Sequence, residues 1–231
     1  MSTRLITELA TVFRTPLTTI KGSITALMEP ATAENREARS ALLAETLTAV
    51  DRLDSIVENL LEMNRLDSGM LKPKKSENDI FDLMSVVADA LRRQSRYYPL
   101  SIRIDEDVPQ VCIDFILIVQ ALTNVLLNVA RHTPPGTPVE LTVERKDRAI
   151  RLTVADKGPG VLPEELPNLF GRFFRGKNAG QGGVGLGLSI CKGIVEAHGG
   201  NISAFINRDG GLSVSIILPD CVAGANRQAA S

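Results

Sequence analysis

The sequence predicts an α+β protein in which a helical hairpin precedes an α/β sandwich. Through residues 1–71 the apolar side chains recur at helical spacings of three and four. After a polar break at residues 72–78, short alternating segments typical of strands are interleaved with helical ones. We therefore expect a hairpin domain at 1–71, a linker at 72–78, a second domain at 79–219 and a disordered tail at 220–231.

Two long helices make up the predicted hairpin. The first runs from Leu5 to about Met28, and its apolar stripe continues in phase beyond Pro16, so this proline should kink the helix without ending it. The second carries its stripe from Leu42 to Leu66. A lone hairpin leaves both stripes uncovered, so we expect a homodimer that forms a four-helix bundle.

The second domain is predicted to be one sheet covered by helices on one face. The expected helices lie at 83–96, 115–132 and 185–197, and the expected strands at 100–104, 139–143, 150–155, 201–206 and 212–218.

Composition limits the possible functions. Lys and Arg number 26 against 27 for Asp and Glu, so bulk charge gives no support to nucleic-acid binding, and we expect none. Cys112, Cys191 and Cys221 are odd in number and far apart, which predicts free thiols in a reducing compartment. We expect a cytoplasmic chain, associated with a membrane only if a sensor region has been removed from it.

A nucleotide site is indicated by Asp156-Lys157-Gly158-Pro159-Gly160, which directly follows a predicted strand. A carboxylate at a strand end accepts hydrogen bonds, which suits the exocyclic amine of adenine, and the glycines permit a tight turn. Taken alone, the pattern also fits a solvated surface turn.

Gly183-Val184-Gly185-Leu186-Gly187-Leu188 precedes a predicted helix. Glycines allow backbone amides to approach phosphate oxygens, and the helix N-terminus favours negative charge. A merely flexible turn is the alternative. No Gly-Lys-Ser/Thr follows, so this is not a Walker loop.

Asn124 and Asn128 lie four residues apart on one face of a predicted helix, with Arg131 one turn further along. Amide oxygens beside a cation suit a hydrated Mg²⁺ and its triphosphate. Asparagines on helices are more often solvated or capping, but these stand in an otherwise apolar helix.

Together these segments resemble the motifs of histidine kinases, in the family's order. Residues 124–136 resemble the N box, 156–160 the first glycine box, 169–175 the F box and 183–188 the second glycine box. The resemblance covers residues 5–219 and extends to the Kdp-type sensor kinases. It implies a Bergerat-type (GHKL) ATP-binding domain after a dimerisation hairpin.

The resemblance also implies roles for individual residues. Asp156 would contact adenine, Asn128 would hold Mg²⁺, and Asn124 and Arg131 would address the phosphates, with Asn124 also catalytic. Phe170 to Gly183 would form a mobile ATP lid. The remaining implied cofactor-binding residues are Gly158, Gly160, Phe170, Arg175, Gly183, Gly185, Leu186, Gly187 and Leu188.

The family's phosphoacceptor box, His-Glu/Asp-Leu-Arg-Thr-Pro-Leu, matches the segment Thr11–Leu17 without its histidine and its acid. Thr11 and Val12 occupy those two positions. A threonine hydroxyl needs a strong adjacent base to act as a nucleophile, and Val12 supplies none. Thr15, which would orient water for a phosphatase reaction, is present but lacks its acidic partner.

Three readings stay open. The preferred one is a pseudokinase-like core that binds Mg-ATP, does not autophosphorylate in the usual place, and regulates two-component signalling with a response regulator. Alternatively, it is an active kinase that phosphorylates a histidine on another histidine kinase in a heterodimer. The third reading is an interaction module that binds no nucleotide.

Overall fold

The computed structural model describes residues 3–33, 35–94, 98–177 and 185–220, and the chain divides into two compact units, residues 1–64 and 65–231. The expectations for Gly183 and for residues 221–231 lie outside the described residues. Asp220, which the sequence places in the predicted tail, is buried, and its N–H donates to the carbonyl of Arg148 at 3.0 Å.

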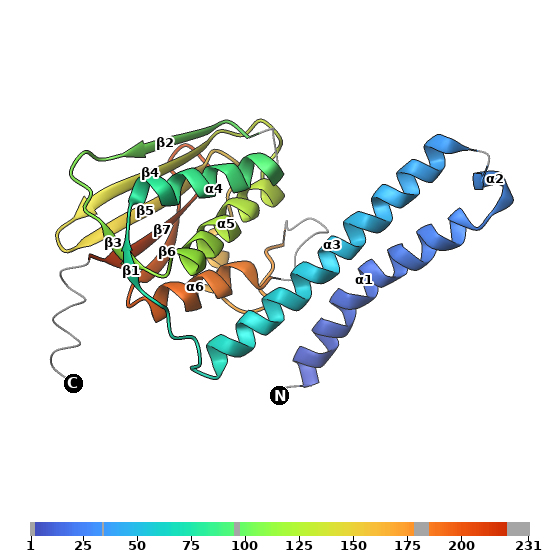
Figure 1. The fold of residues 1–231 in the computed structure, drawn as a ribbon, viewed down its shortest axis with the longest axis horizontal. Coiled ribbons are helices and arrows are strands. Elements are labelled where there is room, and N and C mark those ends of the chain that lie inside the picture. Colours follow the sequence, from blue (N-terminus) through green and yellow to red (C-terminus); the bar gives the residue numbers. More distant parts are fainter. Residues whose placement is uncertain (1–2, 34, 95–97, 178–184, 221–231) are drawn as a thin grey trace. The chain divides into compact units, whose positions relative to one another are not determined.

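The first unit contains the predicted helical hairpin (Figure 1). Helix α1 (Thr3–Leu27) is followed by a single turn, α2 (Pro30–Ala33), and by α3 (Arg36–Asp67). Helix α1 is unbroken at Pro16, as the in-phase stripe predicts. Buried Ser23 joins α1 to α3, because its hydroxyl donates to the carboxylate of Glu45 at 3.1 Å.

A five-stranded sheet forms the second unit, in the order β2-β4-β5-β7-β6. Its strands are β2 (Leu100–Ile104), β4 (Val139–Lys146), β5 (Ala149–Asp156), β6 (Asn201–Ile206) and β7 (Leu212–Pro219). Only the β2–β4 pair within this sheet is parallel. The sheet confirms every predicted strand, with β2 and β6 at the predicted bounds.

Helices α4 (Ile80–Gln94), α5 (Phe115–His132) and α6 (Gly187–Ala197) cover one face of this sheet (Figure 1). Alternate residues of the central strands point into the resulting core, with Leu141 and Val143 on β4 and Leu152 and Val154 on β5 almost fully buried. Helix α5 is long and apolar enough to cross a membrane, but it contributes six buried side chains to this core.

The predicted linker is attached to the second unit. Strand β1 (Ser76–Asn78) pairs with β3 (Val111–Ile113), a second sheet that the sequence did not predict. The Lys74 N–H donates to the Asp114 carboxylate at 2.9 Å, and the Lys75 ammonium donates to the carbonyl of His198 at 2.8 Å. Most of the predicted linker is therefore held against the second unit by strand pairing and hydrogen bonds.

The cysteines only partly follow the prediction. Cys191 is a free thiol, and burial raises its pKa to about 12. That value leaves it protonated and unreactive at neutral pH. Cys112, in contrast, is disulfide-bonded, so the expectation of free thiols was wrong for this residue.

Candidate functional site

The carboxylate of Asp156 lies buried at the last position of β5, with 5% of the residue exposed. Its Oδ1 accepts the N–H of Gly158 at 2.8 Å and that of Leu212 at 3.4 Å. Oδ2 accepts no hydrogen bond from the described residues. Burial raises the pKa of Asp156, and the two amides only partly offset this. The site thus offers one fixed and one available acceptor oxygen.

Gly158 brings the first glycine box against the end of α5. A Cβ on Gly158 would collide with the methyl group of Thr133, the residue that caps α5, and would lie 2.9 Å from Asp156 Oδ1. The hydroxyl of Tyr98 lies 2.9 Å from the carbonyl oxygens of both Ala130 and Thr133, and therefore fixes this helix end.

The turn between β6 and β7 supports the backbone of Asp156. Asn207 donates from Nδ2 to the backbone carbonyl of Asp156 at 3.0 Å, and its Oδ1 accepts the hydroxyl of Ser213 at 2.6 Å. Gly211, at φ 91°, passes so close to the Asp156 carbonyl that no side chain fits there. Gly160, at φ 70°, packs against the Gly211 carbonyl.

Polar residues on α5 point away from the core. Asn124 and Asn128 are half-buried, and Arg131 is exposed in the last helical turn. The side-chain nitrogen of Asn124 is buried without a hydrogen-bond partner. A buried, unpaired amide nitrogen costs about 1–3 kcal/mol, so this donor is better satisfied when an acceptor enters the site.

The N-terminus of α6 has no side-chain cap. Leu186 occupies the cap position, and the hydroxyl of Ser189 donates back to the Leu186 carbonyl at 2.8 Å. The first amides of the helix are therefore left for another acceptor. Leu186 and Leu188 are buried, so only their backbone could reach a ligand.

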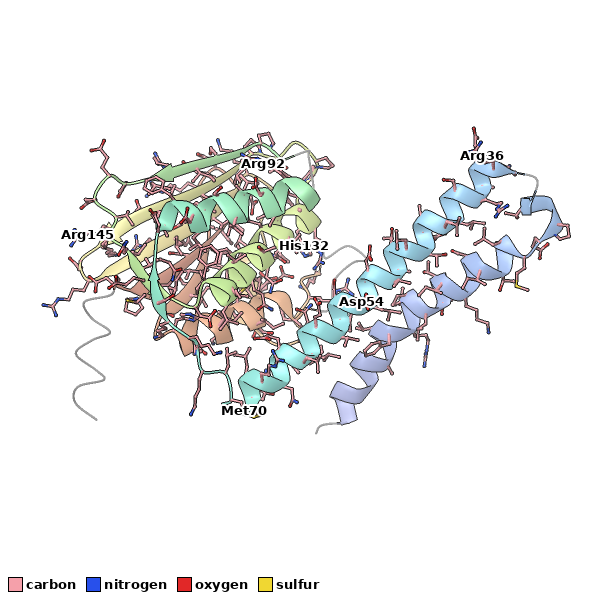
Figure 2. All side chains as sticks on the ribbon, viewed as in Figure 1. Arg36, Asp54, Met70, Arg92, His132 and Arg145 are labelled. Atoms are coloured by element: carbon pink, nitrogen blue, oxygen red, sulfur yellow. The ribbon has the colours of Figure 1, made fainter. Side chains whose placement is uncertain are left out.

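The F-box segment meets both α5 and the second glycine box. His132 lies at the end of α5 (Figure 2), where burial, and after it the charges of Arg131 and Arg175, lower its pKa. A Cβ on Gly185 would lie 2.5 Å from the Phe174 carbonyl oxygen, so only glycine fits there. Phe170 is half-buried.

Comparison with known proteins identifies this arrangement. Residues 113–221 match the model described as "Histidine kinase-, DNA gyrase B-, and HSP90-like ATPase", and residues 1–69 match the "His Kinase A (phospho-acceptor) domain". The solved mycobacterial sensor histidine kinase MprB is 30% identical, with a TM-score of 0.58, over 63% of this chain and 98% of that one.

The chain belongs to the two-component sensor histidine kinases.

Longer relatives extend the similarity across both units. The sensor protein KdpD of Clostridium acetobutylicum is 33% identical over 95% of this chain and 25% of its own length. Full-length ShkA, solved in complex with AMPPNP, is 26% identical, with a TM-score of 0.69, over 95% of this chain and 46% of that one. The chain spans between 24% and 44% of the length of the first curated relatives it matches.

The structure groups Asp156, Gly158 and Gly160 with the end of α5, and both Arg131 and Arg175 act on His132 there. The functional roles predicted for these residues stay predictions. Gly183 and the rest of 178–184 lie outside the described residues. Sequence reasoning missed Tyr98, Thr133, Asn207 and Glu165, and only the turn signal at Asp209–Gly211 pointed toward any of them.

The segment that matches the phosphoacceptor box lies within α1. Thr15 is exposed, Val12 is half-buried and Pro16 is buried. The side chain of Thr11 lies outside the described part of the chain. The roles that the resemblance implies for Thr11 and Thr15 therefore stay predictions.

Gly158→Ala should destabilise the second unit by about 1–3 kcal/mol, because the added methyl group overpacks against Thr133 and the Asp156 carboxylate. Gly187→Ala is the matched control from the other glycine box, since a Cβ there meets nothing within 4 Å. Urea unfolding of the full chain measures both variants. Equal midpoints for the two would contradict the close packing seen at Gly158.

Proposed function

We propose that this chain is a histidine kinase core that binds Mg-ATP but does not autophosphorylate in the usual place, and that it regulates two-component signalling. The observation that carries the proposal is the contrast between two sites. The buried carboxylate of Asp156 keeps an available acceptor oxygen, whereas Thr11 and Val12 replace the histidine and the acid of the phosphoacceptor box.

The geometry around Asp156 supports adenine recognition. Gly158 and Leu212 hold Oδ1 in place, so Oδ2 can accept a hydrogen bond from an exocyclic amine without moving. The uncapped N-terminus of α6 and the guanidinium groups of Arg131 and Arg175 offer donors and positive charge for the phosphates.

Magnesium would be held by Asn128, together with the phosphates themselves. The described residues contain no group of three His, Cys, Asp or Glu side chains that could bind a metal ion unaided. Mg²⁺ commonly keeps several waters and binds through few protein ligands plus substrate phosphates, which suits the amide oxygen of Asn128. The unpaired nitrogen of Asn124 fits a donor to the bound polyphosphate.

Neither histidine of the chain is suited to replace the missing phosphoacceptor. His198 is 1% exposed; its Nε2 accepts the N–H of Asp114 at 3.0 Å, and its Nδ1 lies 2.8 Å from the Ile194 carbonyl. Both ring nitrogens are occupied, and burial lowers the pKa of this histidine. His132 lies in the nucleotide-binding unit, beside two arginines.

The helical hairpin supports dimerisation. Large apolar side chains are exposed along both long helices, although a soluble single hairpin would be expected to cover them. The exposed residues are Leu17, Ile24, Leu43, Leu47, Val50, Val57 and Leu61. A second copy, or another histidine kinase, would cover these stripes in a four-helix bundle.

Two alternatives remain to be tested against this proposal. In a heterodimer the chain could phosphorylate a histidine on a partner kinase, because its defect lies in the acceptor and not in the nucleotide site. In the other alternative, the chain is an interaction module that binds no nucleotide. We expect the chain to act in the cytoplasm, with a response regulator as a further partner.

Asp156→Asn should weaken Mg-ATP binding by at least about tenfold, since an amide nitrogen would face the adenine amine.

The same substitution should also affect stability. The pKa of Asp156 is raised in the folded state, so the ionised carboxylate opposes folding at neutral pH. The variant should therefore unfold at an equal or higher temperature, and this gain should shrink as the pH falls and Asp156 becomes protonated. Calorimetric titration and thermal melts measure both effects. Unchanged affinity in the variant would remove the role of Asp156, and absence of Mg-ATP binding by the wild-type chain would remove both ATP-dependent readings.

Leu47→Glu combined with Leu61→Glu should convert the dimer into monomers, because both leucines are more than half exposed on the α3 stripe, at 62% and 57%. Thr48→Glu, at an exposed neighbouring position, is the control and should leave the dimer intact. Light scattering gives the mass of each. A monomeric wild-type chain would contradict the bundle.

Incubation with labelled ATP should leave no phosphate on the wild-type chain. Thr11→His combined with Val12→Glu should restore acid-labile labelling, because it returns the nucleophile and its base to a box that keeps Arg14, Thr15, Pro16 and Leu17. Mass spectrometry locates the phosphate. Label on a histidine-bearing partner would favour the heterodimer reading, and label on the wild-type chain alone would overturn the preferred one.

A further inference from the structure

The carboxylate of Glu165 is buried and accepts hydrogen bonds from the backbone. Glu165 lies in the 3-10 helix η1 (Pro163–Asn168) and is 8% exposed. Its Oε1 accepts the N–H of Lys177 at 2.7 Å, and its Oε2 accepts the N–H of Leu162 at 3.1 Å. Two backbone amides thus hold the charge, and one of them belongs to the segment that carries Arg175.

The peptide group between Gly176 and Lys177, whose N–H donates to Glu165, follows a strained stretch of backbone. Phe173 has a φ of 58°, in the left-handed region that disfavours a side chain with a Cβ, and such a residue costs about 1–3 kcal/mol. Gly176 fits closely over the carboxylate, since a Cβ there would lie 3.1 Å from each Glu165 oxygen. On its other side the stretch packs against Gly185.

Arg175 lies within the segment that Glu165 holds. After the larger effect of burial, Arg131 and Arg175 both lower the pKa of His132, so the charge of Arg175 acts on the end of α5. The hydrogen bond from Lys177 to Glu165 restrains the backbone two residues from Arg175.

We infer that Glu165 is a positioning residue that holds the segment Phe173–Lys177 so that Arg175 faces the polyphosphate of a bound nucleotide. This inference rests on the proposed nucleotide site and adds to it a residue that would touch neither ATP nor metal. The backbone hydrogen bonds from Lys177 and Leu162 lower the pKa of Glu165, which favours the ionised carboxylate.

Glu164 provides a matched control. It precedes Glu165 in the same helix and bears the same charge, but it is exposed and reaches only the Lys177 ammonium, at 3.6 Å. Such exposed ion pairs contribute little to the stability of the folded protein. Glu164→Ala therefore removes an acid near the same lysine without touching the backbone contact.

The test compares Mg-ATP with adenosine, which lacks phosphates, in titrations of the full chain. Glu165→Ala should weaken Mg-ATP binding about tenfold and leave adenosine binding unchanged. Glu165→Gln, which keeps one acceptor oxygen, should lie between Glu165→Ala and wild type, and Glu164→Ala should stay within about twofold of wild type. Because Glu165 acts through Arg175, adding Glu165→Ala to Arg175→Ala should cause no further loss.

Limited trypsin digestion gives a readout that needs no nucleotide. Cleavage after Arg175 and Lys177 should be faster in Glu165→Ala than in Glu164→Ala. Wild-type affinity in Glu165→Ala, additive losses in the double variant, a parallel loss of adenosine binding, or equal cleavage would each overturn the inference. If the wild-type chain bound no nucleotide while the digestion difference held, only the proposed function would fail.

Discussion

The buried carboxylate of Asp156 is the constraint around which the nucleotide-binding unit is built. Gly158, Leu212 and Asn207 all donate to this residue, and they come from a loop, a strand end and a hairpin turn. Gly158 and Leu212 meet the charge that is removed from water, and Asn207 binds the backbone carbonyl of the same residue, so these three segments cannot move independently. The close approach of Gly211 to the same residue, and of Gly158 to Thr133, follows from that requirement.

Much of the fold could be predicted because its signals are local. Helix α5 and strands β2 and β6 have the predicted bounds, since apolar periodicity, turn residues and the Asp114 cap are all encoded within each segment. The short strands β1 and β3 carry no period of their own and form only by pairing with each other across 35 residues of chain. The disulfide of Cys112 was likewise invisible to spacing arguments.

The residues proposed for the nucleotide site could be named from the sequence, whereas the residues that support them in the structure could not. Asp156, Asn124 and Asn128 could be named because side-chain type and spacing carry their chemistry. Glu165 could not, because its partners are backbone amides of Leu162 and Lys177, which every sequence has. The sequence also does not show which glycines lack space for a side chain. In the structure a Cβ would collide with neighbouring atoms at Gly158 and Gly185 but would meet nothing at Gly187.

The nucleotide site carries several features that oppose folding. Asp156 holds a charge that burial disfavours, Asn124 has a buried nitrogen without a partner, and Phe173 has a left-handed backbone. Each feature is unfavourable in the empty protein, and a bound nucleotide with its Mg²⁺ would relieve all except the strain at Phe173, which fixes the approach of Arg175. Local rules are broken mainly where function requires it. The physical argument for nucleotide binding therefore does not depend on which residue stands at the phosphoacceptor position.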